Sequence, residues 1–220
     1  MSDKNYDIMS QKEQTQNISY ENIPAQEDDF VAEAAAAYQF EKKDGEYTLE
    51  DYYALPDDVR AELIDGHLIY MDAPTTRHQG VIAELHFQVA SYIRSRKGPC
   101  KALFSPLDVC LDNDDKTMLQ PDLIILCDET KDDGKRINGA PDFVAEVVSP
   151  SSVKRDYLIK LNKYWNAKVR EYWIIDPEKQ TVSAYCFEPD EAFSMTQYTF
   201  GRPVPVRIFE GLEVDFSGLS

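Results

Sequence analysis

The sequence predicts an α/β fold of the mixed α+β kind, in which a mixed β-sheet is flanked by helices. Three observations predict it. The periodic segments follow the order hairpin, helix, three strands, helix and further strands. A helix between two strands permits a parallel crossover, whereas short turns join antiparallel neighbours. The 220 residues suffice for one domain with a proper core and are too few for two comfortable ones.

The first 44 residues differ in composition from the rest of the chain. They are rich in Gln, Asn, Glu and Asp, and only an alanine-rich stretch at residues 31–38 could form a short helix. We predict an acidic, flexible extension over residues 1–44 and a folded domain over residues 45–220. For this extension, a solvated segment is favoured over a docking tail.

Short elements with recognisable caps and turns open the folded domain. Thr48, with Asp51 three residues later, is typical of a capping box and predicts a short helix. Strands are predicted over residues 60–64 and 67–71. The dipeptide Asp65-Gly66 between these two apolar runs is a strong signal for a hairpin turn.

A long helix is predicted next, from Thr75 or Thr76 to about residue 97, where Gly98 and Pro99 stop it. Its apolar positions recur at helical spacing: Val81, Ile82, Leu85, Val89, Tyr92 and Ile93. A strand over residues 103–111 and a polar, acidic loop follow. Two strand-length runs rich in β-branched residues come next, at 123–127 and 143–148.

The second helix is predicted over residues 154–167, and strands over 171–175, 181–187 and 193–200 complete the pattern. The buried stripe of this helix is predicted to consist of Tyr157, Leu158, Leu161, Tyr164 and Trp165. The sheet should therefore be antiparallel before this helix and contain a crossover after it.

The cysteines and histidines are too scattered to predict a zinc site. Cys100, Cys110, Cys127 and Cys186 form no close pair, so free buried thiols are expected rather than a disulfide. No apolar run is long enough to span a membrane, and the first residues do not resemble a signal peptide. We therefore expect a cytoplasmic protein without membrane contact.

Two carboxylates stand out in the apolar strands. Glu146 interrupts the run Phe-Val-Ala-Glu-Val-Val, and Asp122 follows Pro121 at the start of another strand. A carboxylate in such a strand is costly to desolvate unless a cation or donors compensate it. If the two strands pair antiparallel, both side chains can converge, and two hard oxygen ligands suit magnesium or manganese. A structural ion pair of Glu146 remains the alternative.

The second helix adds a lysine. Asp156, Lys160 and Tyr164 are spaced i, i+4, i+8 and therefore share a helix face. A solvated ion pair between Asp156 and Lys160 explains this spacing as well. The helix directly follows the Glu146 strand, however, so its first turns must pass close to the carboxylates.

These residues, in this order, resemble the PD-(D/E)XK nuclease superfamily. The resemblance rests on Pro121-Asp122, on Glu146 within "PDFVAEVVSPSS", on Asp156, Lys160 and Tyr164, and on "VREYWIIDP". More narrowly, it points to a bacterial restriction endonuclease branch, once a domain of unknown function, whose usual beginning "YTLEDYYALPDD…ELIDGHLIYMDAP" fits. It covers about residues 47–216 and implies a restriction-endonuclease-like core.

The resemblance implies a role for each matched residue. Asp122 and Glu146 would bind Mg²⁺ or Mn²⁺, and Glu62 in "AELIDG" would complete the metal site as a further acidic residue. The superfamily places its lysine two residues after the second acid, where this chain has Val148. Lys160 is the matching candidate on the following helix.

Four further residues would support the site. Asp156 would hold Lys160, Tyr164 would position the helix or the phosphate, and His78 and Gln79 would line the cleft. The expected function is metal-dependent endonuclease activity on nucleic acid, with DNA favoured and a homodimer left open. One alternative is a degenerate nuclease fold that serves as a binding module. A hydrolase using Glu62 and Glu146 as an acid–base pair is another.

The formal net charge of −17 opposes binding of nucleic acid by bulk electrostatics. The charge is uneven, however, because residues 1–44 contain ten acidic and four basic residues. Basic residues gather on the second helix and at the end of the long helix. The two groups are Lys154, Arg155, Lys160, Lys163, Lys168 and Arg170, and Arg94, Arg96, Lys97 and Lys101. A local basic groove is thus expected, with ordinary solvated helix faces as the alternative.

Overall fold

The computed structural model describes residues 42–111, 114–150, 152–188 and 193–219. They fall into two compact units. Of the described residues, the smaller contains 42–72 together with Asp115–Thr117, and the larger contains the other described residues from Ala73 onward. The short helix expected at residues 31–38 lies outside the described residues, and the extension over residues 1–44 stays a prediction.

The smaller unit holds a short helix and a hairpin: α2 (Leu49–Tyr53), β1 (Ala61–Ile64) and β2 (His67–Tyr70). The backbone N–H of Thr48 donates to the Asp51 carboxylate at 2.8 Å, as the capping box requires. Asp65 and Gly66 both have positive φ, at 50° and 83°, which is the geometry of a tight hairpin turn. A side chain at Gly66 would collide with the carbonyl of Gly45, so glycine is required there.

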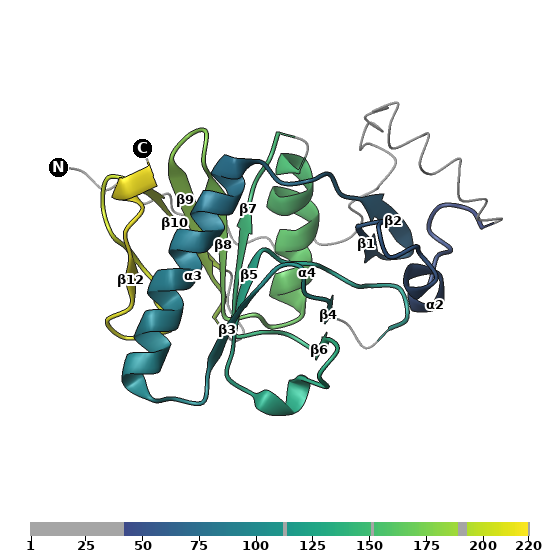
Figure 1. Ribbon diagram of the computed structural model, residues 1–220, viewed down its shortest axis with the longest axis horizontal. Helices are drawn as coiled ribbons and strands as arrows, with labels where there is room; N and C mark the ends of the chain where they lie inside the picture. Colours follow the sequence, from purple (N-terminus) through teal and green to yellow (C-terminus); the bar gives the residue numbers. More distant parts are fainter. Residues whose placement is uncertain (1–41, 112–113, 151, 189–192, 220) are drawn as a thin grey trace. The chain divides into compact units, whose positions relative to one another are not determined.

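The larger unit is built on a six-stranded mixed sheet in the order β10-β9-β8-β7-β5-β3 (Figure 1). Its strands are β3 (Lys101–Phe104), β5 (Leu123–Leu126), β7 (Phe143–Val147), β8 (Glu171–Asp176), β9 (Thr181–Cys186) and β10 (Ser194–Thr199). Only β7 and β8 pair in parallel; the other neighbours are antiparallel. The chain between β7 and β8 forms a π-helix, η3 (Arg155–Lys160), and then α4 (Leu161–Asn166). This is the predicted crossover.

The long helix α3 (Thr76–Arg96) packs against one face of this sheet and forms the hydrophobic core with it. Thr75 accepts the N–H of His78 at the start of α3, and Lys97 ends it with φ 53°. The core includes Val81, Leu85 and Val89 of the helix and Leu123, Ile125, Phe143, Ala145, Val147 and Trp173 of the strands. Since strand side chains alternate between faces, Glu146 points to the opposite face.

Shorter elements complete the unit: β4 (Val109–Cys110), β6 (Ile137–Asn138), β11 (Val204–Pro205), β12 (Glu213–Val214), η2 (Glu129–Lys131) and η4 (Ser217–Leu219). The single strand predicted over residues 103–111 is wrong in its extent. Pro106 has no backbone N–H and cannot continue a ladder. Past it, β4 pairs with β6 in a separate parallel sheet rather than with β5.

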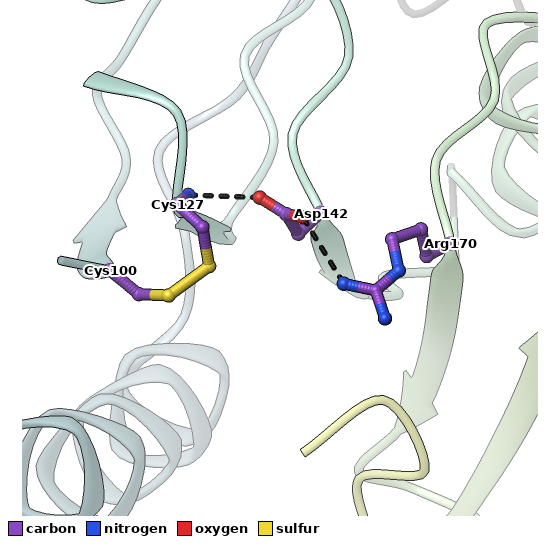
Figure 2. Close-up of a disulfide and its surroundings, with 4 residues drawn as sticks. All are labelled: Cys100, Cys127, Asp142 and Arg170. Atoms are coloured by element: carbon purple, nitrogen blue, oxygen red, sulfur yellow. Dashed lines mark hydrogen bonds and ion pairs between the residues drawn. A yellow bond between two sulfur atoms is a disulfide. The ribbon is translucent and has the colours of Figure 1, made fainter. Parts of the chain in front are cut away.

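The expectation of four free thiols is wrong for two of them. Cys100 and Cys127 form a disulfide across the ends of β3 and β5 (Figure 2). The antiparallel register pairs Lys101 with Leu126, so the residues just outside this pair are brought opposite each other. Because the two cysteines are 27 positions apart in the sequence, their spacing gave no indication that they lie close together. Figure 2 also shows that the Cys127 N–H donates to Asp142, which in turn contacts Arg170.

Candidate active site

Strand register brings the two predicted carboxylates together. Leu123 of β5 lies opposite Ala145 of β7. The next opposed position along this antiparallel pair is Asp122 with Glu146, and side chains at opposed positions lie on the same face. The Val147 N–H donates to Asp122 Oδ2 at 2.8 Å, which fixes the aspartate against β7. The predicted convergence of Asp122 and Glu146 is therefore present in the fold.

Glu146 is bound from the crossover helix. Lys160 Nζ lies 2.8 Å from Glu146 Oε1, and the Tyr164 hydroxyl donates to the same oxygen at 2.7 Å. Glu146 and Lys160 are 4% and 2% exposed. At this burial, water cannot screen the pair as it screens a surface salt bridge. The local fold thus holds a lysine against the central strand carboxylate.

Asp156 completes this cluster one helical turn before the lysine. Its Oδ1 lies 3.8 Å from Lys160 Nζ, and its own side chain is buried. The Tyr172 hydroxyl of β8 donates to the Asp156 main-chain carbonyl at 3.1 Å. The sequence analysis did not identify Tyr172 as part of the site. Side chains alternate along β8, so Tyr172 lies on the face opposite Trp173, and this alternation could have indicated it. The tyrosine ties the π-helix to the sheet at the residue that contacts Lys160.

His78 reaches the cluster from the first turn of α3. Its Nε2 lies 3.2 Å from Asp122 Oδ2. Burial alone would lower the pKa of His78, but the hydrogen bond to Asp122 and the negative charge of Asp122 outweigh burial, so the pKa is raised. The contact between these two side chains thereby joins the N-terminus of α3 to the start of β5.

Three carboxylates, those of Asp122, Glu146 and Asp156, lie beside basic side chains in this cluster. Lys160 contacts Glu146 and Asp156, Arg155 Nε lies 4.0 Å from Asp156 Oδ1, and His78 lies beside Asp122. Within the described ranges, no group of three or more His, Cys, Asp or Glu side chains is arranged to hold a metal ion. Magnesium, however, is commonly held by one or two carboxylates, with water and phosphate as its other ligands. Asp122 and Glu146 fit that donor set.

A family model described as "Putative restriction endonuclease", the Uma2 family, matches residues 49–217. This chain belongs to the Uma2 family. The fold is also similar to the crystal structure of "a putative nuclease belonging to DUF820" from Anabaena variabilis. That similarity has a TM-score of 0.63 at 20% identity, and it covers 78% of this chain and 96% of the other. No curated protein matches the chain.

Membership of the Uma2 family confirms the resemblance found in the sequence, and the fold match confirms the mixed sheet with flanking helices. It also places the chain in a nuclease family. In this Uma2 chain, the larger unit unites Asp122, Glu146, Lys160, Asp156, Tyr164 and His78. The position two residues after Glu146 carries Val148, which is buried, while the amine lies on the crossover helix.

Two predicted members of the site are not part of this set. Glu62 is buried on β1 of the smaller unit, and its role as a further metal ligand stays a prediction. Gln79 follows His78 in α3 and is exposed. No helix of the described residues is long and apolar enough to cross a membrane.

Proposed function

We propose that this chain is a metal-dependent endonuclease that hydrolyses phosphodiester bonds, with DNA as its substrate. The observation that carries the proposal is the buried contact between Lys160 and Glu146, the residue that lies opposite Asp122 across β5 and β7. Two carboxylates that can hold a divalent metal, and an amine that can offset negative charge on a phosphate, suit metal-assisted phosphodiester hydrolysis. Membership of a nuclease family supports the same reading.

Asp122 and Glu146 would hold Mg²⁺ or Mn²⁺, which supplies, when bound, Lewis acidity and a more acidic water. Lys160 contributes a fixed positive charge beside Glu146, where it offsets the charge that builds on the phosphate oxygens. Asp156 and Tyr164 restrict the positions of Lys160 and Glu146 through their own contacts. His78 contacts the same Asp122 oxygen that accepts the Val147 N–H. No covalent intermediate is required by this arrangement.

Plasmid nicking with Mg²⁺ or Mn²⁺ tests the proposal. The wild-type chain should convert supercoiled plasmid to the nicked form, and Asp122→Ala and Glu146→Ala should each abolish that conversion. Lys160→Met should also remove activity, because it keeps the length of the side chain without its charge. A Glu178→Gln chain, altered at an exposed turn, is the matched control. Equal activity in all chains would sink the proposal, and activity that survives EDTA would favour an acid–base hydrolase.

A catalytically degenerate fold that acts as a binding module is the second candidate. One observation favours it: Glu146 Oε1 already accepts from both Lys160 and Tyr164. A carboxylate so engaged could serve a structural role instead of binding metal. Calorimetry with Mn²⁺ separates the two candidates. Binding that is lost in Glu146→Gln supports the endonuclease, whereas absence of binding by the wild-type chain supports the degenerate fold.

A further inference from the structure

The six-stranded sheet ends in two edge strands, and only one of them is shielded against pairing with a further strand. An edge strand presents unpaired N–H and C=O groups, which proteins shield by charged side chains, by proline or by keeping the strand short. β3 is shielded in this way, because it has four residues, begins with Lys101 and is followed by Pro106. β10 lies at the other end of the sheet, beside β9 (Figure 1), and lacks these features.

β10 is a regular strand with an open outer edge. All six of its residues, Ser194–Thr199, pair with β9 in one continuous register without a bulge. Because backbone groups alternate in an antiparallel ladder, every second residue of β10 directs its N–H and C=O away from β9. No strand of the described residues pairs with that side. None of the six residues is buried, whereas β9 is buried along most of its length. β10 can therefore accept a further strand.

The charge of this edge indicates which partner it fits. Residues 193–201 contain no charged side chain, although 29% of the chain is charged. Two copies of a chain with a net charge of −17 repel each other, and a neutral strand lets them meet without adding to that repulsion. The two ends of β10 differ in sign. Exposed Glu188 lies at its start, two residues beyond the Cys186–Ser194 pair, and exposed Arg202 follows its end.

A two-fold axis makes these ends complementary. Two identical edges related by such an axis run antiparallel, so the acidic end of each strand lies toward the basic end of the other. The axis is perpendicular to the sheet and keeps each face on its own side, so it passes through Thr196 or Gln197 when the two strands overlap most fully. Every opposed pair within β10 is then uncharged. Since each copy has one such edge, the assembly closes at two subunits.

We propose that β10 is the interface of a homodimer, in which the β10 strands of two copies pair antiparallel and join the two sheets. The inference goes beyond the proposed function and does not depend on it, because β8 and β9 separate β10 from the strand that carries Glu146. One strand edge buries less area than a standard interface between proteins, so the dimer should dissociate on dilution.

Sedimentation velocity over a range of concentrations tests the proposal with the full chain. Wild type should pass from monomer to dimer without larger species. Gln197→Lys should raise the dissociation constant at least about 10-fold, because the new charge lies at or beside the axis and meets its own copy. Ser91→Lys adds the same charge at an exposed position of α3. It is the matched control and should associate like wild type.

A charge swap tests the antiparallel arrangement. Arg202→Glu and Glu188→Arg each give β10 two ends of the same sign, so at low salt each should weaken its own dimer by roughly 2- to 5-fold. A mixture of the two variants should recover wild-type affinity, because acidic ends then lie toward basic ends in the mixed dimer. A mixture as weak as the single variants would contradict the antiparallel pairing.

Other results would overturn the dimer itself. A wild-type chain that stays monomeric up to about 1 mM excludes it. Equal dissociation constants for wild type and Gln197→Lys would place the association elsewhere on the chain. If Gln197→Lys melts early by circular dichroism, Gln197→Glu takes its place, since two carboxylates repel as two amines do.

Hydrogen exchange of the β10 amides identifies the occupant of the edge. Protection that rises with the concentration of the full chain supports pairing between two copies. Protection that is independent of concentration would assign the edge to another segment of the same chain and would overturn the proposal.

Discussion

At the scale of single residues, the Lys160–Glu146 contact stabilises the fold and also contains two candidate catalytic groups. Lys160 is buried between two carboxylates, those of Glu146 and Asp156. Removing one partner of a buried ion pair is more damaging than replacing both, because the remaining charge keeps its desolvation cost. Stability and the proposed chemistry would therefore depend on the same amine.

This asymmetry predicts the stability of variants of the pair. Lys160→Ala should lower the free energy of unfolding by about 3–5 kcal/mol, since it leaves Glu146 and Asp156 without their shared cation. The double replacement of Lys160 by Met and Glu146 by Leu should be less destabilised than Lys160→Ala. Urea unfolding followed by circular dichroism measures both. A Lys160→Ala chain as stable as wild type would contradict the buried pair.

Single residues also explain which part of the site was predictable. Polar residues that interrupt apolar runs can be found by inspection, so Asp122, Glu146 and the shared face of Asp156, Lys160 and Tyr164 were identified. Their bonding partners were not, because Val147 contributes a backbone N–H and Tyr172 a hydroxyl from distant strands. Such contacts depend on strand order, which local spacing does not encode.

The loop before β6 carries a pH-dependent contribution. Asp133 accepts the backbone N–H of Arg136, the Asn138 side chain and the backbone N–H of Lys135, which lower its pKa to about 2. The ordinary value is 3.8, so the contribution to stability is complete above pH 3.8 and is lost as pH falls through about 2. A carboxyl NMR titration should show this late protonation. In Asp133→Asn the loop should lose that acid dependence, and a titration midpoint near 3.8 in wild type would refute it.

At the scale of elements, the crossover helix shows where a periodicity argument fails. We predicted its buried stripe with the period of an α-helix, and that stripe is wrong at Leu158, which is 54% exposed. Residues Arg155–Lys160 form a π-helix, whose wider turn rotates later side chains relative to an α-helix. The buried residues are Asp156, Ile159, Lys160 and Tyr164. Adjacent helices and strands with a regular period were predicted well.

The π-helix predicts that substitutions at two neighbouring residues lower the stability of the chain by very different amounts. Ile159→Ala should destabilise the chain by about 2–4 kcal/mol, because it leaves a cavity at a buried position. Leu158→Ala should change the free energy of unfolding by less than about 0.5 kcal/mol, as surface substitutions do. Thermal or urea unfolding of the two variants provides the comparison. A larger loss of stability in Leu158→Ala than in Ile159→Ala would instead support the buried stripe predicted for an α-helix.

The disulfide between the ends of β3 and β5 leads to a second prediction at this scale. The chain has four cysteines, of which Cys100 and Cys127 form the disulfide and Cys110 and Cys186 are buried thiols outside it. Thiol titration of the unreduced, unfolded chain should therefore count two thiols, and the native chain should react slowly. Replacing both joined cysteines by serine should cost about 3.5 kcal/mol, from the loop-closure entropy of a 27-residue separation. Four thiols in the unreduced chain would show that the link is absent.

At the scale of the whole molecule, the distribution of charge decides how a chain with a net charge of −17 can approach a polyanion. Residues 1–41 contain nine acidic and two basic residues, so this segment carries seven of the net negative charges. The segment of residues 73–107, with five basic residues and one acidic residue, has the opposite sign. The long-range field of the chain therefore opposes the short-range attraction of its basic residues for a polyanion, and salt screens both.

A chain that begins at Lys42 isolates the acidic segment. Lys42 is retained because its amine lies 2.6 Å from the Asp51 carboxylate. Removing residues 1–41 should strengthen binding of DNA at low salt, because the net charge becomes less negative by seven. The gain should shrink as salt rises, since the effect acts at long range. Anisotropy titrations at several salt concentrations measure it. A gain that is constant with salt would contradict a long-range electrostatic effect of the removed segment.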